Sequence, residues 1–402
     1  DEHHIAVKDN DNVTLLAWEQ NKNDKEILFA KYTDATWRIE TREDENTSTF
    51  YQLSMESQWQ PISALSLNVS LGSSASDYSQ PKVNKVNIRK TGVDIVTDFR
   101  EDRFYGESYS TNMDTASLTG LTVKDLYFQE NEIRTSYNNV KASLRYLFSN
   151  GDAVSAGAHY KSFENTGMDR ARSVYPALDD NTLSKAHVSL FSQHPDKTWM
   201  QGNLNAIQTH FGLGNVQLTA EDTVDSSNFK VKENTLALYA MYDSVGHWLG
   251  KPLYTQGGIR YFNTQFTSSG IQKGLPSAVT KTYDDVLFSV NTVLELNDNW
   301  LWRASVDENI TRPSIQDLAI TAEVSQASRN EGDIGQVFLG NPYLKPLKSL
   351  NVETGVEWYF EDGGIMALSS FFKQINNFVV EDVEAIPYRE LGLPASLLQD
   401  GD

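Results

Sequence analysis

The side chains of this 402-residue chain that could act as acids or bases are carboxylates spaced along apolar segments. The clearest are Glu295, Asp307, Glu353 and Glu357. Two carboxylates facing one another would suit the hydrolysis of a glycosidic bond. These acids, however, recur on one parity of segments whose other parity is apolar, which is the period of a β-strand. We therefore interpret them as part of a charged wall, paired with Arg145, Arg260 or Arg303, and predict no catalytic residue.

Other reaction chemistries lack their characteristic residues. The sequence has no cysteine, and its seven histidines show neither His-x-x-x-His nor Glu-x-x-His spacing, so we predict no metal site. Gly212-Leu213-Gly214 comes nearest to a phosphate-binding loop, but Gln217 occupies the position of the third glycine. The formal net charge of -20 argues against a nucleic-acid partner. We predict no cofactor and no enzymatic activity.

Aromatic residues in the long polar connections are the candidate ligand-binding residues. They are Tyr105, Tyr109, Tyr175, Trp199, Phe211 and Tyr343. Aromatic rings present flat apolar faces with polar edges, on which a sugar or a chelate could be held. The alternative for each ring is ordinary packing or exposure within a loop.

The elements that position these residues are strands with two distinct faces. Residues 286–296, 300–307 and 352–360 alternate between apolar or aromatic side chains and polar ones, as half-buried strands do. Residues 140–148 and 154–161 do the same around Asn150-Gly151, a pair that favours a type I′ turn. Residues 182–191 and 200–210 carry weaker, helix-like patterns within a long connection.

Short turns and long connections alternate along the chain. We place short turns near residues 22, 62, 151, 248, 298 and 362, and longer connections near 44, 80–130, 167–230, 270–280, 312–348 and from 381. About twelve strands result, an arrangement typical of a membrane barrel with short periplasmic turns and long extracellular loops. The sequence therefore predicts an all-β protein, a transmembrane antiparallel β-barrel.

Three segments also carry a family resemblance. They are "YDDVLFSVNTVLELNDNWLWRASVDENITRPSIQDL" (Tyr283–Leu318), "GNPYLKP" (Gly340–Pro346) and "LNVETGVEWYF" (Leu350–Phe360). From about Thr47 onward the chain resembles the barrel of TonB-dependent outer-membrane receptors, with most similarity to the carbohydrate-uptake branch. The resemblance implies a 22-stranded, plugged barrel. Residues 1–402 would then be a partial barrel domain, with the plug domain and the terminal strands outside this chain.

The resemblance implies active import through the outer membrane of a Gram-negative bacterium. The implied partners are outer-membrane lipid, the TonB complex acting through a plug domain not in this chain, and a small-molecule or oligosaccharide ligand. An oligosaccharide is the favoured ligand and an iron-siderophore the second. The loop Ser314–Leu347 would be extracellular and border the ligand.

Two other functions remain open at the level of sequence. One is a secreted acidic all-β carbohydrate-active enzyme or binding module, and the other is a plain diffusion porin. The outward face of the strands separates the first from a receptor. A soluble protein buries its apolar strand faces in a shared core, whereas a barrel presents them to lipid as a continuous belt and keeps a polar interior.

Overall fold

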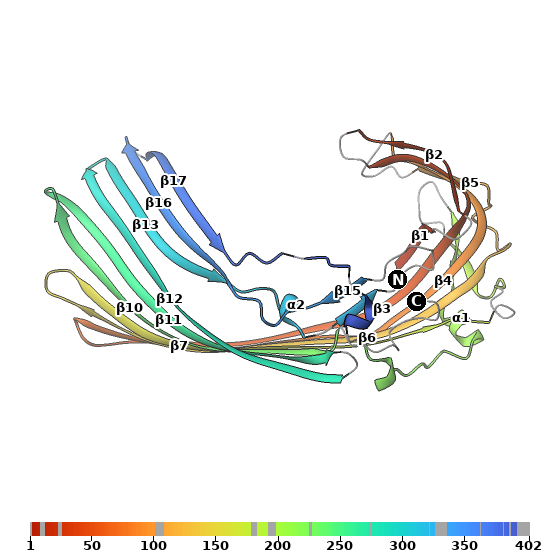
Figure 1. Cartoon of the computed structure of the whole chain (residues 1–402), viewed down its shortest axis with the longest axis horizontal. Helices are drawn as coiled ribbons and strands as arrows, with labels where there is room; N and C mark the ends of the chain where they lie inside the picture. Colours follow the sequence, from red (N-terminus) through yellow and green to blue (C-terminus); the bar gives the residue numbers. More distant parts are fainter. Residues whose placement is uncertain are drawn as a thin grey trace.

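A curved antiparallel sheet forms most of the molecule (Figure 1). The computed structural model describes residues 2–8, 13–22, 26–100, 108–177, 183–191, 198–224, 227–272, 275–320, 322–325, 336–361, 363–380, 382–385 and 387–391. Within these residues the sheet has thirteen strands, in the order β1-β3-β4-β6-β7-β10-β11-β12-β13-β16-β17, with β2 paired to β3 and β5 to β4. Its neighbouring strands are all antiparallel, which confirms the predicted all-β antiparallel fold.

The elements have the following bounds. The sheet contains β1 (Glu2–Lys8), β2 (Thr14–Gln20), β3 (Ile27–Ile62), β4 (Leu65–Asp98), β5 (Ser108–Thr111), β6 (Thr122–Leu147), β7 (Ala153–Val174), β10 (Phe229–Trp248), β11 (Lys251–Gln272), β12 (Leu275–Asn297), β13 (Trp300–Thr311), β16 (Leu347–Phe360) and β17 (Gly364–Asn376). Two small sheets pair β8 (Val188–Phe191) with β9 (Trp199–Gly202), and β14 (Ala322–Ser325) with β15 (Gln336–Leu339). The helices are α1 (Leu204–His210), the 3-10 turn η1 (Ala220–Asp222), α2 (Ile315–Leu318) and α3 (Tyr388–Leu391). None of the helices in the described ranges is long and apolar enough to cross a membrane.

The two faces of the sheet differ in polarity. Strand pairing aligns one apolar row across the sheet: Trp59, Leu67, Leu144, Ala156, Ala240, Ile259 and Phe288. The adjacent row on the opposite face is mostly polar: Gln58, Asn68, Ser143, Gly157, Tyr239 and Arg260. Four residues of β10 lie on the apolar face: Leu236, Leu238, Ala240 and Tyr242. We call these residues, together with the residues paired with them across the neighbouring strands, the apolar belt.

The apolar belt lies on the convex face. Figure 1 shows α2 within the curve of the sheet, and Leu318 of α2 packs against Val231 and Phe266. Because side chains alternate between faces along a strand, Leu236 and Leu238 must point the other way from Val231. Both leucines are half exposed, as are many belt side chains, so the apolar face is not buried in a core.

Short turns gather at one end of the sheet, which we call the turn end. They lie at residues 63–64, 148–152, 249–250, 298–299 and 361–363, as the sequence predicts. The connections between β4 and β6, β7 and β10, and β13 and β16 are long and lie at the opposite, loop end (Figure 1). The predicted short turn near residue 22 lies instead at the loop end. The reason is that β2 pairs with residues 27–33 of β3, which lie at that end of the strand.

The strands run further than predicted at the loop end. β3 continues through residues 42–46, where a break is expected, because the charged side chains pair: Arg42 with Asp44 at 2.7 Å, and Glu43 with Lys82 at 2.9 Å. The predicted connection at 80–130 shrinks to 99–121. The predicted connection at 270–280 is instead a continuous hairpin whose register reaches Gln272 and Leu275.

Two local predictions are also wrong. Only Gly151 of the Asn150-Gly151 pair has a positive φ (94°), and it lies in a five-residue connection, whereas a type I′ turn needs two such residues. The two-residue turn between β10 and β11 does have two such residues: φ is 51° at Leu249 and 76° at Gly250. The helix-like pattern at 182–191 contains β8 instead, whereas the pattern at 200–210 does contain α1.

Candidate functional site

Part of the β13–β16 connection folds back onto the concave face. We call its described residues 312–320 and 340–346 the inner loop. Leu318 is buried against Val231 and Phe266, while Ile315 and Leu344 pack at the edge of the same cluster. The backbone N–H of Ile320 donates to Ser268 Oγ at 2.9 Å, and Lys281 Nζ donates to the carbonyl of Leu344 at 2.7 Å. The inner loop is therefore fastened to the wall of the sheet by apolar and polar contacts.

Arg312 anchors the start of the inner loop. Its Nε lies 2.8 Å from Glu233 Oε1 and 3.2 Å from the hydroxyl of Tyr283. Its Nη2 lies 3.5 Å from Thr235 Oγ1, which in turn shares a 2.8 Å hydrogen bond with Thr264 Oγ1. The Glu233 side chain is only 12 % exposed, so loss of the guanidinium would leave a carboxylate unpaired in a poorly hydrated position. We call these five residues the Arg312 network.

The remainder of the concave wall is polar, and some of its charged side chains form ion pairs. Near the turn end, Arg303 Nε lies 2.7 Å from Glu357 Oε1, which confirms one of the predicted ion pairs. Arg145 pairs with Asp243 instead of one of the predicted acids. Among the described residues no group of three or more metal-ligating side chains occurs. The arrangement is suited to holding a loop and lining a wet passage.

A second loop docks on the convex side, outside the apolar belt. Arg172 of β7 makes a bidentate contact with Asp222 of η1, at 2.7 and 2.6 Å. Asp222 Oδ2 also accepts from the backbone N–H of Thr219 at 2.7 Å. The Arg172 guanidinium holds the pKa of the Asp222 carboxyl at about 2, below its usual range. The pair fastens the β7–β10 connection to the sheet.

The predicted aromatic residues do not form one cluster. Tyr105 lies outside the described residues, and Tyr109 lies in β5. Tyr175 and Tyr343 are 68 % and 67 % exposed beyond the ends of strands, as expected for loop residues. Trp199 is 7 % exposed, because β9 packs on the sheet. The Trp199 ring lies 4.5 Å from the ring of Phe191, centre to centre. The Trp199 ring belongs to the larger of the two hydrophobic cores of the described residues, so the predicted place in an open loop is wrong.

Phe211 follows α1 and packs against the same core as Trp199. These two are the only predicted aromatic residues that the described part of the chain brings into one cluster. The Trp199 ring is buried, and the Phe211 ring is partly buried. Ligand contact by any of the six stays a prediction.

Sequence reasoning assigned no role to the Arg312 network. Arg312 belongs to the quoted Ile-Thr-Arg-Pro segment, and Pro313 correctly marks the end of β13. Glu233 and Lys281 occupy the polar parity of their strands, which was a usable signal. The contacts of Arg312 join residues some 30 to 80 positions apart in the sequence. Such contacts depend on the register between strands, which the local sequence pattern does not show.

Solved outer-membrane receptors resemble the chain in fold. The ferric-catecholate import receptor Fiu of E. coli is 12 % identical, with a TM-score of 0.39, over 94 % of this chain and 55 % of that one. The hemophore receptor HasR of Serratia marcescens is 10 % identical, with a TM-score of 0.37, over 91 % and 50 %. The alcaligin receptor FauA of Bordetella pertussis is 10 % identical, with a TM-score of 0.37, over 96 % and 52 %. The chain spans about half the length of each of these receptors.

Sequence comparison with curated proteins finds no significant match. The family model described as TonB dependent receptor-like, beta-barrel, matches residues 7–392. That range includes the apolar belt, the inner loop and the Arg312 network. The chain therefore belongs to the TonB-dependent receptor-like β-barrel family.

Proposed function

We propose that this chain forms part of a receptor that imports a scarce ligand by TonB-coupled active transport. The observation that carries the proposal is the two-faced sheet of a family member: its apolar belt is exposed on the convex face, while its concave face is polar. Proteins of this family lie in the outer membrane of Gram-negative bacteria, and so does this chain. A soluble β enzyme would bury the apolar face instead.

The concave wall would line the passage, and the inner loop would border it. A plug domain outside this chain would rest against the wall and transmit the pull of the TonB complex. Besides its charged side chains, the polar row of the wall carries hydroxyl and amide groups that a passing ligand could contact, such as those of Asn68 and Ser143, which are not buried. Such groups suit a neutral oligosaccharide, our proposed ligand, and an iron-siderophore is the alternative.

Growth of a strain lacking the receptor gene tests both ligands. We expect the deletion to abolish growth on an oligosaccharide such as maltotriose or a xylo-oligosaccharide as sole carbon source, and to leave growth on a ferric siderophore unchanged. Loss of siderophore-dependent growth alone would replace the oligosaccharide by the alternative. Normal growth on every ligand, or uptake that persists without TonB, would refute the transport proposal.

The Arg312 network allows a residue-level test in the complemented strain. Arg312→Ala in the full-length receptor leaves Glu233 unpaired, at a cost of about 1–3 kcal/mol, and should loosen the inner loop. We expect the initial uptake rate to fall about tenfold or more at an unchanged receptor level. Arg134→Ala is the matched control, because Arg134 is 68 % exposed on the convex face. Equal uptake by the two variants would show that the inner loop does not take part in transport.

A further inference from the structure

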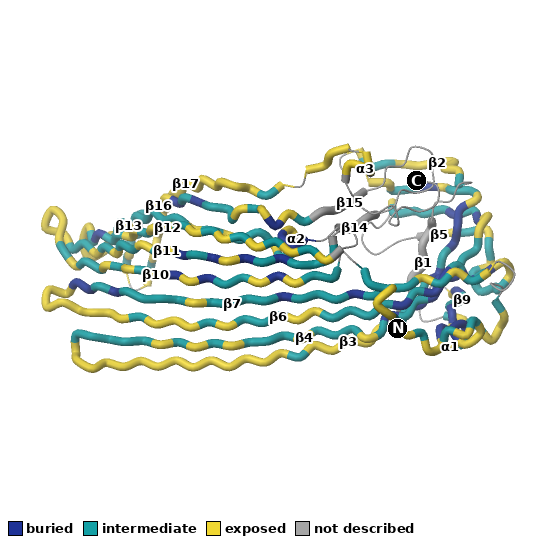
Figure 2. Tube along the Cα trace, turned by 60° about the horizontal axis from the view of Figure 1, so that its bottom comes forward, coloured by how far each residue is buried: buried dark blue, intermediate teal, exposed yellow. Residues whose placement is uncertain are grey.

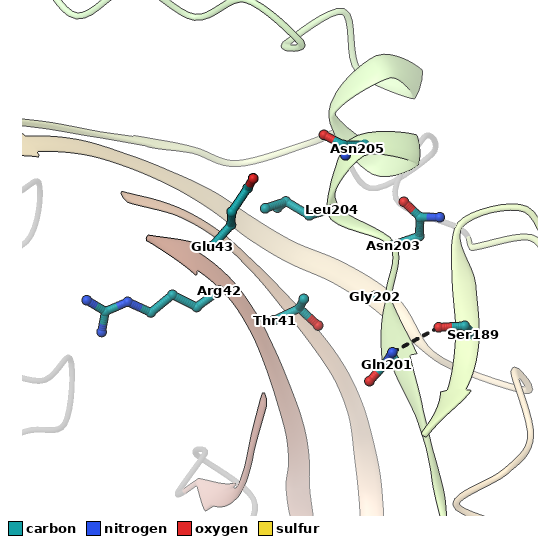
Figure 3. Close-up of a pocket in the computed structure, with 9 residues that line it drawn as sticks. All are labelled: Thr41, Arg42, Glu43, Ser189, Gln201, Gly202, Asn203, Leu204 and Asn205. Carbon is teal, nitrogen blue, oxygen red and sulfur yellow. Dashed lines mark hydrogen bonds between the residues drawn. The ribbon is translucent and has the colours of Figure 1, made fainter. Parts of the chain in front are cut away.

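A small polar pocket lies between β3 and the β8–β9–α1 segment (Figure 3). Its volume is about 270 Å³, enough for several water molecules or one sugar unit. The lining side chains that carry hydroxyl, amide or carboxylate groups are Thr41, Glu43, Ser189, Gln201, Asn203 and Asn205. Leu204 adds the only sizeable apolar side chain among the lining residues.

The pocket lies on the convex side, far from the concave passage. Thr41 pairs in register with Val86, and Val86 with Leu126. Leu126 shares the parity of Leu144 on β6, so these side chains point to the same face as the apolar belt. Thr41 lies about 45 Å along β3 beyond the belt residue Met55, at about 3.3 Å per residue, and therefore at the loop end outside the membrane.

Two buried polar atoms of the pocket have no hydrogen-bond partner among the described residues. They are Thr41 Oγ1 and Gln201 Oε1. Thr41 is only 7 % exposed, and Gln201 is held by the hydrogen bond from its Nε2 to Ser189 Oγ at 3.0 Å (Figure 3). A buried polar atom left unpaired costs about 1–3 kcal/mol, so this pocket favours an occupant that can donate to the amide oxygen. A hydroxyl group could donate to Gln201 and accept from Thr41.

The charges at the pocket are paired, which favours a neutral ligand. Glu43 is the only charged side chain at the rim besides Arg42, and Figure 3 shows the Arg42 guanidinium directed away from the pocket. Arg42 pairs with Asp44 at 2.7 Å on the far side of β3. The Glu43 carboxylate is itself paired with Lys82 at 2.9 Å. Neither charge at the rim is therefore left without a partner, and among the described residues the pocket offers no free cation to a phosphate or carboxylate ligand.

We propose that this pocket binds a neutral saccharide unit at the outer surface of the receptor, separately from the concave passage. The hydroxyl groups of one sugar ring can act as donors and acceptors at once, which matches the mixed hydroxyl and amide lining. The saccharide belongs either to a free oligosaccharide or to the glycan of a surface glycolipid. With no aromatic platform in the lining, binding rests on hydrogen bonds and has a dissociation constant on the order of 1 mM.

Saturation-transfer NMR on the full-length receptor in detergent tests the proposal with two probes. One is maltotriose, and the other is the core oligosaccharide released from the host's own outer-membrane glycolipid. We expect one of them to bind, and which one binds identifies the source of the saccharide. Binding of neither probe, or stronger binding of inorganic phosphate, would overturn the proposal.

Two variants assign the binding to the pocket. Thr41→Val keeps the shape of the side chain and removes its hydroxyl, and Gln201→Ala removes the amide oxygen. Each should weaken binding at least about fivefold, the loss of one hydrogen bond to a neutral group. Thr47→Val is the matched control, because Thr47 is exposed on the same strand and does not line the pocket. Wild-type affinity in either pocket variant would refute the assignment.

Discussion

At the scale of single residues, the loop end is held together by charge pairs that cross between strands and connections. Arg312 holds the inner loop to Glu233 of β10, and Arg172 of β7 holds the β7–β10 connection to the sheet through Asp222. Both pairs join an arginine near the end of a strand to an acid on another segment. Planar, multi-donor arginine suits this task, because it can satisfy two acceptors at once. The loops are thereby positioned by a few identifiable side chains.

The Arg172–Asp222 pair yields a prediction about pH. A carboxyl whose pKa is lowered on folding stabilises the folded state above its ordinary pKa and loses that effect as the pH falls toward its folded value. The pKa of Asp222 is about 2, so docking of the β7–β10 connection should weaken only as the pH falls from about 4 to about 2. Hydrogen exchange of α1 and η1 in the full-length receptor, followed against pH, measures this.

The variant Asp222→Asn should show the same weakening at neutral pH. We expect exchange protection in η1 to fall by about threefold to tenfold, a modest effect because Arg172 is 38 % exposed and solvent screens the pair. Glu221→Gln changes the exposed neighbouring acid, which attracts Arg172 only weakly, so it should lower protection much less than Asp222→Asn. Protection in Asp222→Asn equal to that of the wild type would show that the pair does not fasten the connection.

At the scale of elements, the long strands that carry the apolar belt place one parity toward lipid and the other toward the concave side. Leu144 and Ser143 are adjacent on β6, yet they belong to the apolar row and the polar row respectively. Leu144→Arg should cost about 2–4 kcal/mol of folding free energy in a bilayer, because it places a charge against lipid. Ser143→Arg should cost much less, since its side chain enters the wet interior.

Urea titration of the full-length receptor refolded into phospholipid vesicles measures both variants. The comparison is internal, because the two substitutions introduce the same side chain one residue apart. Equal destabilisation by the two arginines would contradict the assignment of the convex face to lipid.

At the scale of the whole molecule, the described sheet is open. β17 pairs only with β16, and beyond Arg42 the other edge is β3, which pairs there only with β4 (Figure 2 shows β17 and β3 on opposite sides of the sheet). In lipid, unpaired backbone groups along a strand edge are costly, so a sheet with both of these edges exposed to lipid would be unstable. The family match confirms the predicted TonB-dependent receptor family. The prediction that residues 1–402 form only part of a barrel stays a proposal.

The open edges predict how residues 1–402 behave when expressed alone. Refolded into vesicles, this polypeptide should give no compact band that resists unheated detergent in electrophoresis, whereas the full-length receptor should give one. The physical reason is the two unpaired edges, which favour aggregation over insertion. A heat-sensitive compact band from residues 1–402 alone would mean that the edges find partners within this chain.

The sequence by itself determined the features that depend on neighbouring residues. Alternation along residues 140–148 or 286–296 identifies strands and their lipid face, and turn residues mark the turn end, because strand geometry repeats every two residues. The Ile-Thr-Arg-Pro and Gly-Asn-Pro segments also pointed to the correct family.

Only the tertiary structure decided what happens beyond the belt. It showed that β3 continues through its charged run, that Trp199 is buried in a hydrophobic core, and that Arg312 contacts Glu233. These outcomes depend on contacts between residues distant along the chain, whose energies outweigh local preference. A polar run pairs into a strand or loops away according to what lies across from it, and that partner is set by the register of the folded sheet.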